Sequence, residues 1–580
     1  PGKDGADGEA SGDGGGGEPK CGEQLFSYDA PAGTAEVLLS GNFNQWAATA
    51  ATATALKDDD GDGTWTAMVT LEPGTWEYKF IVDGKWIPDP ANPSQVDDTF
   101  GGFNSVLIVA PCPTGWQLVW SKGGGESADF DAELKWLPGG LKAEQLTVTL
   151  DWQAVAAQDV VVSADGATVK VKGLAKGIHD LRLQVGDEMV LLKVLVGVSA
   201  DWRDSVLYFV MTDRFSNGDK TNDAPVAGVD ARTNYQGGDF AGVTQKLNAG
   251  YFSSLNVGAI WLSWPVDNPD GFEAGGFPDQ EGCNLQPKTT KYSEMKYTGN
   301  HGYWPSQLYK TDEHFGSMAE LQELVNAAHA KGIRVLLDFT ANHVHTASPF
   351  FADNKDKGFF HMPAEICQDV GWDNKPVTCW FTPYLADLNY SNPAAIKAML
   401  DYALFWAKQA GSDGFRLDAV KHVEMDFVKA LRQRTKQEME LTGVPFYIVG
   451  ETFTGDAGAI AAFVGDDRIH GQFDFPANLQ ILKGLAKSEI GLGEMDKNVR
   501  GAKAVYGPDA IMSNFIGNHD IARFISHASG SLGCGIWDVV SNQAAGWKNP
   551  PKPPAESAGY ERLKLAFTYI MTVPGVPLVY

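Results

Sequence analysis

The sequence of 580 residues lacks any uninterrupted apolar run of about 18 residues, so it predicts no segment that spans a membrane. Basic residues are scarce relative to acidic ones: 46 Lys and Arg stand against 73 Asp and Glu, a formal net charge of −27. A surface of this sign repels nucleic acids and anionic membranes. We therefore expect neither as a partner.

Cysteine is also scarce, and the sequence has only six: Cys21, Cys112, Cys283, Cys367, Cys379 and Cys534. An even number permits disulfides without proving them. Position alone suggests two pairings as hypotheses: Cys367 with Cys379, which lie close together, and Cys21 with Cys112, which bracket one candidate domain. No signal peptide is present and the first residue is not Met, so the start resembles a processed or trimmed end.

At this length we expect about three domains, because one core cannot serve the whole chain. Residues 1–20 consist largely of Gly, Asp and Glu, and they predict a flexible acidic linker. Residues 22–112 alternate between polar and apolar positions, with a turn at Asp83-Gly84, and predict a β-sandwich. Residues 113–200 alternate again, and predict a second, immunoglobulin-like β-sandwich that acts as a spacer.

From residue 201 to residue 580 the pattern becomes one of strands alternating with helices, which predicts a parallel sheet. Helices are expected between the strands, for example over 317–331 and 393–410. Eight strands joined by crossover helices make a closed (β/α)8 TIM barrel, here with a small inserted domain after strand three, at about 340–392. The eight candidate strands are 206–211, 257–263, 333–338, 413–418, 446–451, 471–475, 512–517 and 575–580.

The segment Gly414-Phe415-Arg416-Leu417-Asp418 combines a buried strand pattern with two charged residues. Arg416 and Asp418 are two positions apart, so their side chains point to the same side of a strand. Burying both is costly unless they pair or take part in chemistry. The arginine would keep the carboxylate ionised, as a nucleophile requires. Taken alone, however, the pair is better explained as a structural ion pair.

Three further apolar runs also end in acids, or in His and Asn: they lie at 338–343, 449–452 and 515–520. In a β/α barrel the strand ends converge on one face, and that face holds the active site. In this order, the four segments resemble the four signature regions of the α-amylase family of glycoside hydrolases, and the resemblance covers about residues 201–580.

The resemblance implies that two carboxyl groups in different protonation states cleave a glycosidic bond. It assigns Asp418 as the nucleophile and Glu451 as the acid/base, while Asp520 holds substrate hydroxyls and Arg416 keeps Asp418 charged. For a retaining reaction the two carboxyl groups should lie about 5–5.5 Å apart. The other substrate contacts that the resemblance implies are His343, His519, Tyr303, Lys421 and His422. The alternative for His343 and His519 is that both are ordinary core residues.

Two segments of the N-terminal region, 39–46 and 78–86, resemble the glycogen- and starch-binding modules attached to amylolytic enzymes and to an energy-sensing kinase. This resemblance implies that a glucan is held by two tryptophans and a lysine, with an asparagine nearby. By match these are Trp46, Trp86, Lys79 and Asn104. The alternative is a module that serves only as a spacer.

Two Ca²⁺ sites are implied by resemblance, and both offer the hard oxygen ligands that calcium prefers. Asn342, Asp387 and the backbone oxygen of His422 match the family's site between barrel and insertion. An Asp- and Asn-rich loop resembles a calcium loop of cyclodextrin-forming relatives, although a metal-free turn is the alternative. Its candidate ligands are Asn217, Asp219, Asn222, Asp223, Gly237 and Asp239.

Two features of the sequence give conflicting signals about which member of the family this is. Lys421-His422 and the calcium loop resemble α-amylases and cyclodextrin glucanotransferases, whereas the N-terminal module is more usual in debranching and branching members. We expect an α-amylase-type endo-hydrolase of α-1,4 bonds in starch, glycogen or maltodextrin. The alternatives are a cyclomaltodextrinase or neopullulanase, a cyclodextrin glucanotransferase, and a catalytically silent glucan-binding protein.

The sequence also carries expectations about setting and extent. We expect a secreted, periplasmic or cell-surface protein. In the resembled family the eighth strand is followed by a last helix and a C-terminal β domain. This sequence stops at Tyr580, so we expect that end to be missing.

Overall fold

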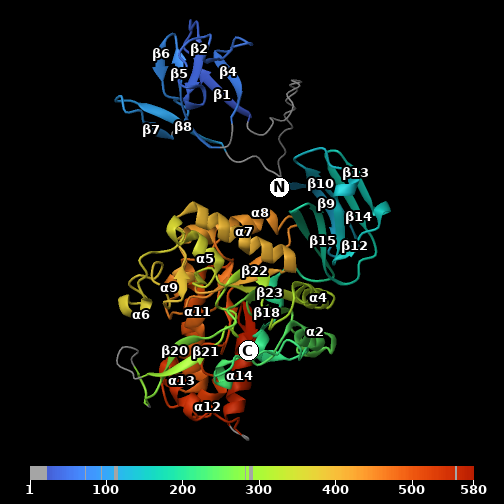
Figure 1. The fold of residues 1–580 in the computed structure, drawn as a ribbon, viewed down its shortest axis with the longest axis vertical. Helices are drawn as coiled ribbons and strands as arrows, with labels where there is room; N and C mark the ends of the chain where they lie inside the picture. The colour runs from blue at the N-terminus through green and yellow to red at the C-terminus, as the bar shows by residue number, and fades with distance from the viewer. Residues whose placement is uncertain are drawn as a thin grey trace, which may run out of the picture. The chain divides into compact units, whose positions relative to one another are not determined.

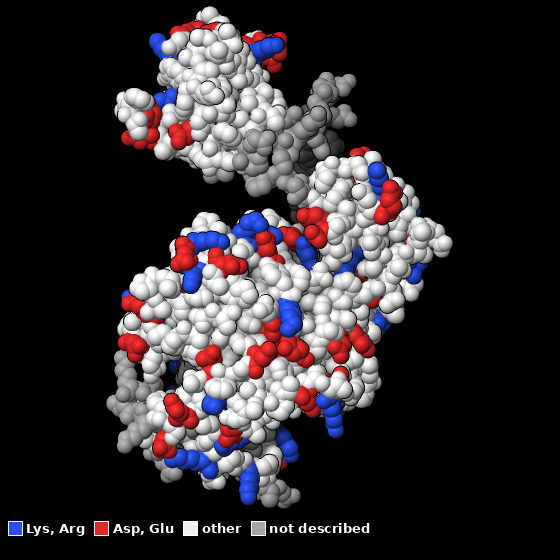
Figure 2. Space-filling model, viewed as in Figure 1, with Lys and Arg blue, Asp and Glu red and all other residues white. Residues whose placement is uncertain are grey.

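A computed structural model describes residues 23–71, 74–92, 94–109, 115–280, 282–285, 292–554 and 558–580. The chain divides after Gly115 into two compact units. Among the helices of the described ranges, none is both long and apolar enough to cross a bilayer. On the face shown in Figure 2, Lys and Arg lie dispersed among Asp and Glu. The predicted linker at 1–20 and the suggested pair of Cys21 and Cys112 lie outside the described residues.

The N-terminal unit is built of antiparallel strands (Figure 1). Strand β1 (Glu23–Asp29) pairs with β4 (Thr64–Thr70). A larger sheet has the order β3-β2-β5-β8-β7, with β6 paired to β5. Because a strand points alternate side chains to one face, apolar residues of β1, β2 and β5 meet in a single core. The bounds in the larger sheet are β2 Val37–Gly41, β3 Thr54–Ala55, β5 Gly74–Val82, β6 Lys85–Ile87, β7 Gln95–Asp97 and β8 Phe103–Val109.

The second unit begins with two four-stranded antiparallel sheets, in the orders β13-β14-β10-β9 and β12-β11-β15-β16. Apolar side chains such as Phe130 and Leu134 of one sheet and Leu181 and Leu192 of the other share a core. These strands therefore form a sandwich. Their bounds are β9 Trp116–Gly124, β10 Ser127–Trp136, β11 Thr147–Leu150, β12 Gln153–Ala154, β13 Val160–Ser163, β14 Gly166–Val171, β15 Gly177–Val185 and β16 Glu188–Val196.

The rest of the second unit is a parallel β/α barrel with the strand order β28-β27-β26-β23-β18-β17-β30-β29. A parallel bridge between Phe473, next to β28, and Ser513 of β29 joins the two edge strands and closes the barrel. The predicted TIM barrel is thus confirmed, and each of its strands lies within one residue of a predicted range or inside it. The bounds are β17 Leu207–Val210, β18 Ala259–Leu262, β23 Arg334–Phe339, β26 Gly414–Leu417, β27 Tyr447–Gly450, β28 Gly471–Gln472, β29 Ser513–Asn514 and β30 Val576–Val579.

Helices cover the barrel strands, and their ends carry the expected signals. Helix α4 (Met318–His329) begins at a capping box in which Ser317 and Glu320 bond to each other's backbone N–H groups. Helix α7 (Pro393–Ala410) has the predicted bounds, with Pro393 in its first turn. It ends at Gly411, whose φ of 75° is unfavourable for residues with a side chain.

A buried ionic cluster joins the sandwich to the barrel. The Lys193 ammonium of β16 lies 2.7 Å from Asp180 of β15 and 3.0 Å from Asp413, directly before β26. It also donates to the carbonyl oxygen of Gly411 at 2.7 Å. His329 Nε2 contacts Asp413 Oδ2 at 2.8 Å. Burial opposes ionisation of Asp413, yet His329 and Lys193 hold its pKa below the usual range. The start of β26, at the end of the barrel opposite the predicted acids, is therefore anchored to the sandwich by charge.

Two disulfides lie within the described residues. Cys367 bonds to Cys379 in the insertion, which confirms the pairing suggested by their spacing. Cys283 bonds to Cys534, a pairing that the sequence analysis did not make because 251 positions separate the two. Inside the insertion, β24 (His343–His345) pairs with β25 (Leu385–Asp387) and ties the start of this segment to its end.

Candidate active site

The predicted acids meet at the carboxyl ends of neighbouring barrel strands. Asp418 directly follows β26, Glu451 directly follows β27, and Asp520 lies in the loop after β29. They border one cavity of about 840 Å³. The predicted residues His343, His519, Tyr303, Lys421 and His422 line it too, with Met211, Arg214, His301, Trp304, Trp372, Phe381, Leu385, Ala419, Phe453 and Val539.

Arg416 lies beneath this cavity and contacts three carboxylates. Its Nη1 is 2.9 Å from Asp338 Oδ1 and 2.5 Å from Asp418 Oδ1. Its Nη2 is 2.9 Å from Glu451 Oε2. Only 1% of Arg416 is exposed, so these ion pairs form almost out of contact with water. One guanidinium therefore fixes the positions of both carboxyl groups that the chemistry requires.

Glu451 is the acid of the site that burial keeps protonated. Burial raises its pKa to about 8, and the nearby charges of Asp520 and Asp418 add to this, while Arg416 opposes it. The ion pair with Arg416 alone would lower the pKa, so desolvation is the larger effect here. Although 43% of the Asp520 side chain is exposed, desolvation and the charge of Asp418 raise its pKa to about 6. At neutral pH Glu451 can thus donate a proton, which suits the role of general acid.

Asp338 is a part of the site to which the sequence analysis gave no role, although it begins one of the four motifs. It is fully buried, and burial raises its pKa to about 7. The Tyr303 hydroxyl donates to Asp338 Oδ2 at 2.6 Å, and the Trp261 indole N–H donates to the same oxygen at 3.1 Å. Asp338 therefore holds both Arg416 and Tyr303 in place. Its position at the end of a barrel strand was the signal that could have identified it.

Two predicted histidines and Tyr303 form one wall of the cavity. The rings of Tyr303 and His519 are nearly parallel, with an interplanar angle of 6° and centroids 5.5 Å apart. His343 Nε2 donates to the carbonyl oxygen of Tyr303 at 2.9 Å. Burial lowers the pKa of His519 to about 3 and lowers that of His343, so both imidazoles are neutral. Their Nδ1 atoms are buried and have no hydrogen-bond partner within the described part of the chain.

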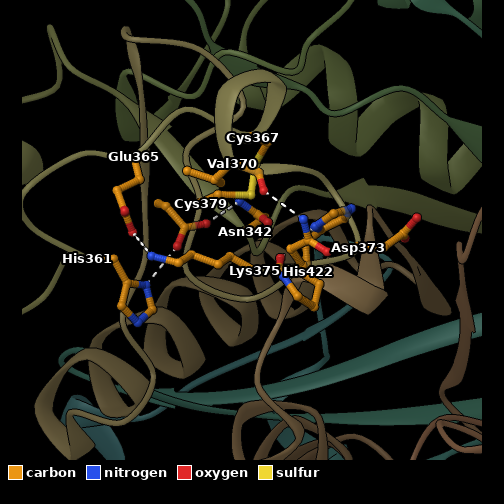
Figure 3. Close-up of a disulfide and its surroundings, with 12 residues drawn as sticks. Asn342, His361, Glu365, Cys367, Val370, Asp373, Lys375, Cys379 and His422 are labelled. Carbon is orange, nitrogen blue, oxygen red and sulfur yellow. Dashed lines mark hydrogen bonds and ion pairs between the residues drawn. A yellow bond between two sulfur atoms is a disulfide. The ribbon is translucent and has the colours of Figure 1, made fainter.

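The insertion supplies a second wall, because its residues Trp372, Phe381 and Leu385 line the cavity. Figure 3 shows the surroundings of the disulfide of Cys367 and Cys379 in this insertion. Lys421 Nζ lies 3.3 Å from Asp373 Oδ1, and His422 Nδ1 contacts the carbonyl oxygen of Pro376 at 2.6 Å. The ring of Phe381 meets His422 at a centroid distance of 4.9 Å. The sequence analysis did not predict Trp372 and Phe381 as lining residues. They reach the site from an irregular insertion, and no local sequence pattern marks such side chains.

The first predicted calcium site contains buried oxygens that fit a cation. Asn342 Nδ2 donates to Asp387 Oδ1 at 2.8 Å, and His361 Nδ1 contacts Asp387 Oδ2 at 2.7 Å. Burial raises the pKa of Asp387 well above its usual range and that of Glu424 to about 7. Asn342 Oδ1 and Glu424 Oε2 are buried without a hydrogen-bond partner among the described residues. Unsatisfied oxygens beside buried carboxylates are suitable for Ca²⁺. The closeness of the backbone oxygen of His422 stays a prediction.

The second predicted calcium site is only partly assembled. Asn217 Nδ2 donates to Asp223 at 2.8 Å, and Asn222 Oδ1 is buried with no partner in the described chain. Gly237 has a φ of 85°, which favours glycine, and a side chain there would have to displace the Asp223 carboxylate. Asp239 instead caps α2 (Phe240–Asn248): its carboxylate accepts from three backbone N–H groups, including that of Gly242 at 2.6 Å.

Asp219 is the remaining predicted ligand of this loop. Its Oδ1 accepts hydrogen bonds from the backbone N–H and the hydroxyl of Thr221, at 2.9 and 2.7 Å. Elsewhere among the described residues, two further groups of three acids are close enough to share a cation, but neither includes a predicted ligand. They are Asp58, Asp60 and Asp62, and Asp267, Asp270 and Glu313.

In the N-terminal unit the two predicted tryptophans lie side by side. The rings of Trp46 and Trp86 have centroids 6.2 Å apart at an interplanar angle of 49°, and 42% of Trp86 is exposed. Lys79 and Asn104 are instead engaged with acids: Lys79 Nζ pairs with Asp98 at 2.5 Å, and Asn104 Nδ2 donates to Glu77 at 2.8 Å.

The fold and the acids together define a TIM-barrel protein with a carboxylate active site at its strand ends. Residues 209–534 match the family described as alpha amylase, catalytic domain, and this match covers more than half of the chain. The chain therefore belongs to the α-amylase family. Residues 25–114 match the glycogen recognition site of AMP-activated protein kinase, a module of the kind expected for this region.

Curated relatives include a beta/alpha-amylase of Paenibacillus polymyxa, 30% identical over 401 residues, which are 66% of this chain and 28% of that protein. A cyclomaltodextrin glucanotransferase of Bacillus sp. (strain 6.6.3) is 29% identical over 402 residues, which are 65% of this chain and 48% of the relative. The chain thus spans about half the length, or less, of these relatives.

Similar solved structures include an Anoxybacillus alpha-amylase, 28% identical with a TM-score of 0.51, which covers 66% of this chain and 71% of that one. An alpha-amylase from Geobacillus thermoleovorans complexed with acarbose is 30% identical with a TM-score of 0.50, covering 65% and 70%. These likenesses agree with the family and with the barrel.

Proposed function

We propose that the protein is an α-amylase-type glycoside hydrolase that cleaves internal α-1,4 bonds of starch, glycogen or maltodextrin with retention of configuration. The observation that carries this proposal is the pair of carboxyl groups held by Arg416 on one cavity. Asp418 lies 2.5 Å from the guanidinium, whereas burial raises the pKa of Glu451 to about 8. Two carboxyl groups in different protonation states are what a retaining glycosidase needs.

In the proposed reaction, the Asp418 carboxylate attacks the anomeric carbon while Glu451 gives its proton to the oxygen of the leaving sugar. The glycosidic bond breaks, and a covalent glycosyl-enzyme forms. Glu451, now a carboxylate, takes a proton from water, and the water oxygen displaces Asp418. Asp520, His343 and His519 hold the hydroxyls of the bound sugar, and Tyr303 presents its ring to it. Lys421 and His422 meet sugars on the leaving side.

A glucanotransferase is the second candidate, because the family relatives include a cyclomaltodextrin glucanotransferase and the loop at 217–239 resembles a calcium loop of that class. Both reactions share the glycosyl-enzyme and differ in whether water or a sugar hydroxyl displaces Asp418. The difference therefore depends on the acceptor and not on the acids.

Calcium, the binding module and the setting are part of the same proposal. Asn342, Asp387 and the His422 carbonyl would hold one Ca²⁺, with Glu424 beside them; Asn217, Asn222, Asp223 and Gly237 would hold a second. Bound calcium would neutralise buried carboxylates and stabilise the fold. The N-terminal unit would bind glucan through Trp46 and Trp86, and the region of β9 to β16 would act as a spacer. The two disulfides favour an extracytoplasmic location.

The test is a timed product analysis on soluble starch and on cyclodextrin with added Ca²⁺. An endo-hydrolase shortens starch rapidly into mixed maltooligosaccharides and opens cyclodextrin slowly, whereas a glucanotransferase makes cyclodextrins from starch. Fast opening of cyclodextrin to maltose would indicate a cyclomaltodextrinase. Glu451→Gln should lower the rate by at least about a hundredfold, because the proton donor is lost. Normal hydrolysis by that variant would contradict the site assignment.

A further inference from the structure

One rim of the catalytic cavity is formed by a segment to which none of the four signature segments assigns a role. It comprises residues 534–543, which include the start of helix α13 (Val539–Lys548). Val539 is 37% exposed and lines the catalytic cavity. It also lines two adjoining cavities of about 340 and 430 Å³. The catalytic cavity therefore continues past Val539 along this rim.

The smaller adjoining cavity links the catalytic acids to an unsatisfied amide. Asp520 and His519 border both this cavity and the catalytic one, and Asn542 lies on its wall. The Asn542 amide N–H donates to the carbonyl oxygen of Gly535 at 2.8 Å. Only 6% of Asn542 is exposed, and its Oδ1 is buried with no hydrogen-bond partner among the described residues. A buried acceptor without a partner is costly unless a ligand supplies the donor.

The larger adjoining cavity offers an aromatic surface beside polar groups. Trp537 lines it, together with Asn284 and Asp538. The Trp537 ring lies 5.3 Å from that of Phe453, which borders the catalytic cavity. Its indole N–H donates to Asn478 Oδ1 at 3.2 Å, which fixes the orientation of the ring. An indole next to hydrogen-bonding side chains is the kind of surface on which a sugar ring packs.

The rim is held in place by a chain segment far away in the sequence. The disulfide of Cys283 and Cys534 joins it to the connection between β20 (Glu273–Pro278) and β21 (Tyr292–Tyr297). Next to the disulfide, the Asn284 backbone N–H donates to Asp538 at 2.6 Å, and that of Leu285 donates to the Ser541 hydroxyl at 3.0 Å. The two cavities are therefore preformed, which lowers the entropic cost of binding.

We propose that this rim is an additional glucan-binding site that continues the catalytic cleft and holds further glucosyl units of a long α-glucan. Asn542 Oδ1 accepts a hydrogen bond from a sugar hydroxyl, and the Trp537 ring packs against a sugar. The inference rests on the proposed function, and it adds a preference for long chains over short ones, set by this rim and its disulfide.

The test compares kcat/KM for maltoheptaose with that for maltotetraose. Val539→Arg places a long charged side chain at the junction of the three cavities, and Asn542→Leu removes the acceptor with little change in volume. Each should lower the ratio of the two constants, Val539→Arg by about tenfold, because only the longer substrate reaches the rim. Val505→Arg, at an exposed valine of helix α11 (Leu492–Tyr506), is the matched control and should keep the ratio.

Thermal unfolding shows whether each variant is folded. A ratio unchanged in Val539→Arg and in folded Asn542→Leu overturns the inference while leaving hydrolysis intact. If the native protein cleaves neither oligosaccharide, the proposed function fails and not the site. Calorimetric titration of the intact protein with maltoheptaose then decides: weaker binding by Val539→Arg supports the site, and equal binding overturns it.

Discussion

At the catalytic centre, one arginine is shared by three buried carboxyl groups. Arg416 contacts Asp338, Asp418 and Glu451, so a single positive charge stands against three acids. Burial raises the pKa of Glu451 to about 8 and that of Asp338 to about 7. Desolvation of Glu451, to which the charges of the neighbouring acids add, is therefore what provides a proton donor at neutral pH.

The alkaline limit of activity should follow the titration of Glu451. Its pKa of about 8 lies above the ordinary value, so the proton donor is present below that pH and is lost as the pH rises through it. Because the charge of Asp520 contributes to this rise, Asp520→Asn should move the alkaline limb of its residual kcat/KM down by about one pH unit. Asp356→Asn, at an exposed acid of the insertion, should leave the limb in place. A limb that stays near 8 in Asp520→Asn would contradict the assigned coupling.

The residues that sequence reasoning predicted are those whose position is set locally. Asp418 and Glu451 each follow a buried strand directly, and the barrel brings such positions together. Trp372 and Val539 reach the cavity from an insertion and from a long loop, whose paths no periodicity describes. Pairing Cys283 with Cys534 requires the same long-range information, whereas Cys367 and Cys379 are only 12 positions apart.

At the scale of elements, Lys193 of β16 provides the charge that holds the sandwich against the start of β26. It contacts Asp180 and Asp413, both buried, and Lys193→Met would leave these two carboxylates short of a partner. Removing one member of a buried charge cluster costs about 3–5 kcal/mol of the free energy of unfolding. We expect a loss of this size in urea unfolding, whereas Lys170→Met, at an exposed lysine of the same sandwich, should change little.

The pH dependence of this variant separates charge from packing. The pKa of Asp413 is lowered in the folded protein, so its contribution to stability is present above the ordinary pKa of an aspartate and is lost as the pH falls through the folded value. The difference between Lys193→Met and the native protein should therefore shrink at acid pH. A difference that is constant with pH would mean that packing, and not charge, holds the two elements together.

The loop at 217–239 is an element whose shape suits a bound cation. Asn222 Oδ1 is buried without a partner among the described residues, and Gly237 brings the backbone close to the Asp223 carboxylate. If this loop binds Ca²⁺, adding the ion at about a hundredfold its dissociation constant should raise stability by about 2.7 kcal/mol. Asp223→Ala should remove this increment, and Asp219→Ala should remove less, because Asp219 is engaged with Thr221. Equal melting temperatures with and without Ca²⁺ in the native protein would contradict both proposed sites.

For the whole molecule, the architecture was more predictable than the details of the cleft. Alternation with period two predicted the strands that precede residue 200, and strand–helix alternation predicted the closed barrel, because both patterns reflect burial of one face. The shape of the cleft depends on irregular segments such as 298–306, 340–392 and 517–548. Their conformations are set by disulfides and single hydrogen bonds, which leave no periodic signal.

The N-terminal unit should tether the molecule to polymeric glucan through its paired tryptophans. Trp46 and Trp86 place two apolar ring surfaces 6.2 Å apart, and a glucan can pack on both only if both rings remain. Trp46→Ala/Trp86→Ala should weaken binding to insoluble starch by about tenfold or more in a pull-down of the full chain. The loss of binding should exceed any change in kcat/KM for a soluble maltooligosaccharide. Trp120→Ala, at a tryptophan of β9 that is 41% exposed, is the matched control. Equal starch binding by the double variant and this control would make the unit a spacer.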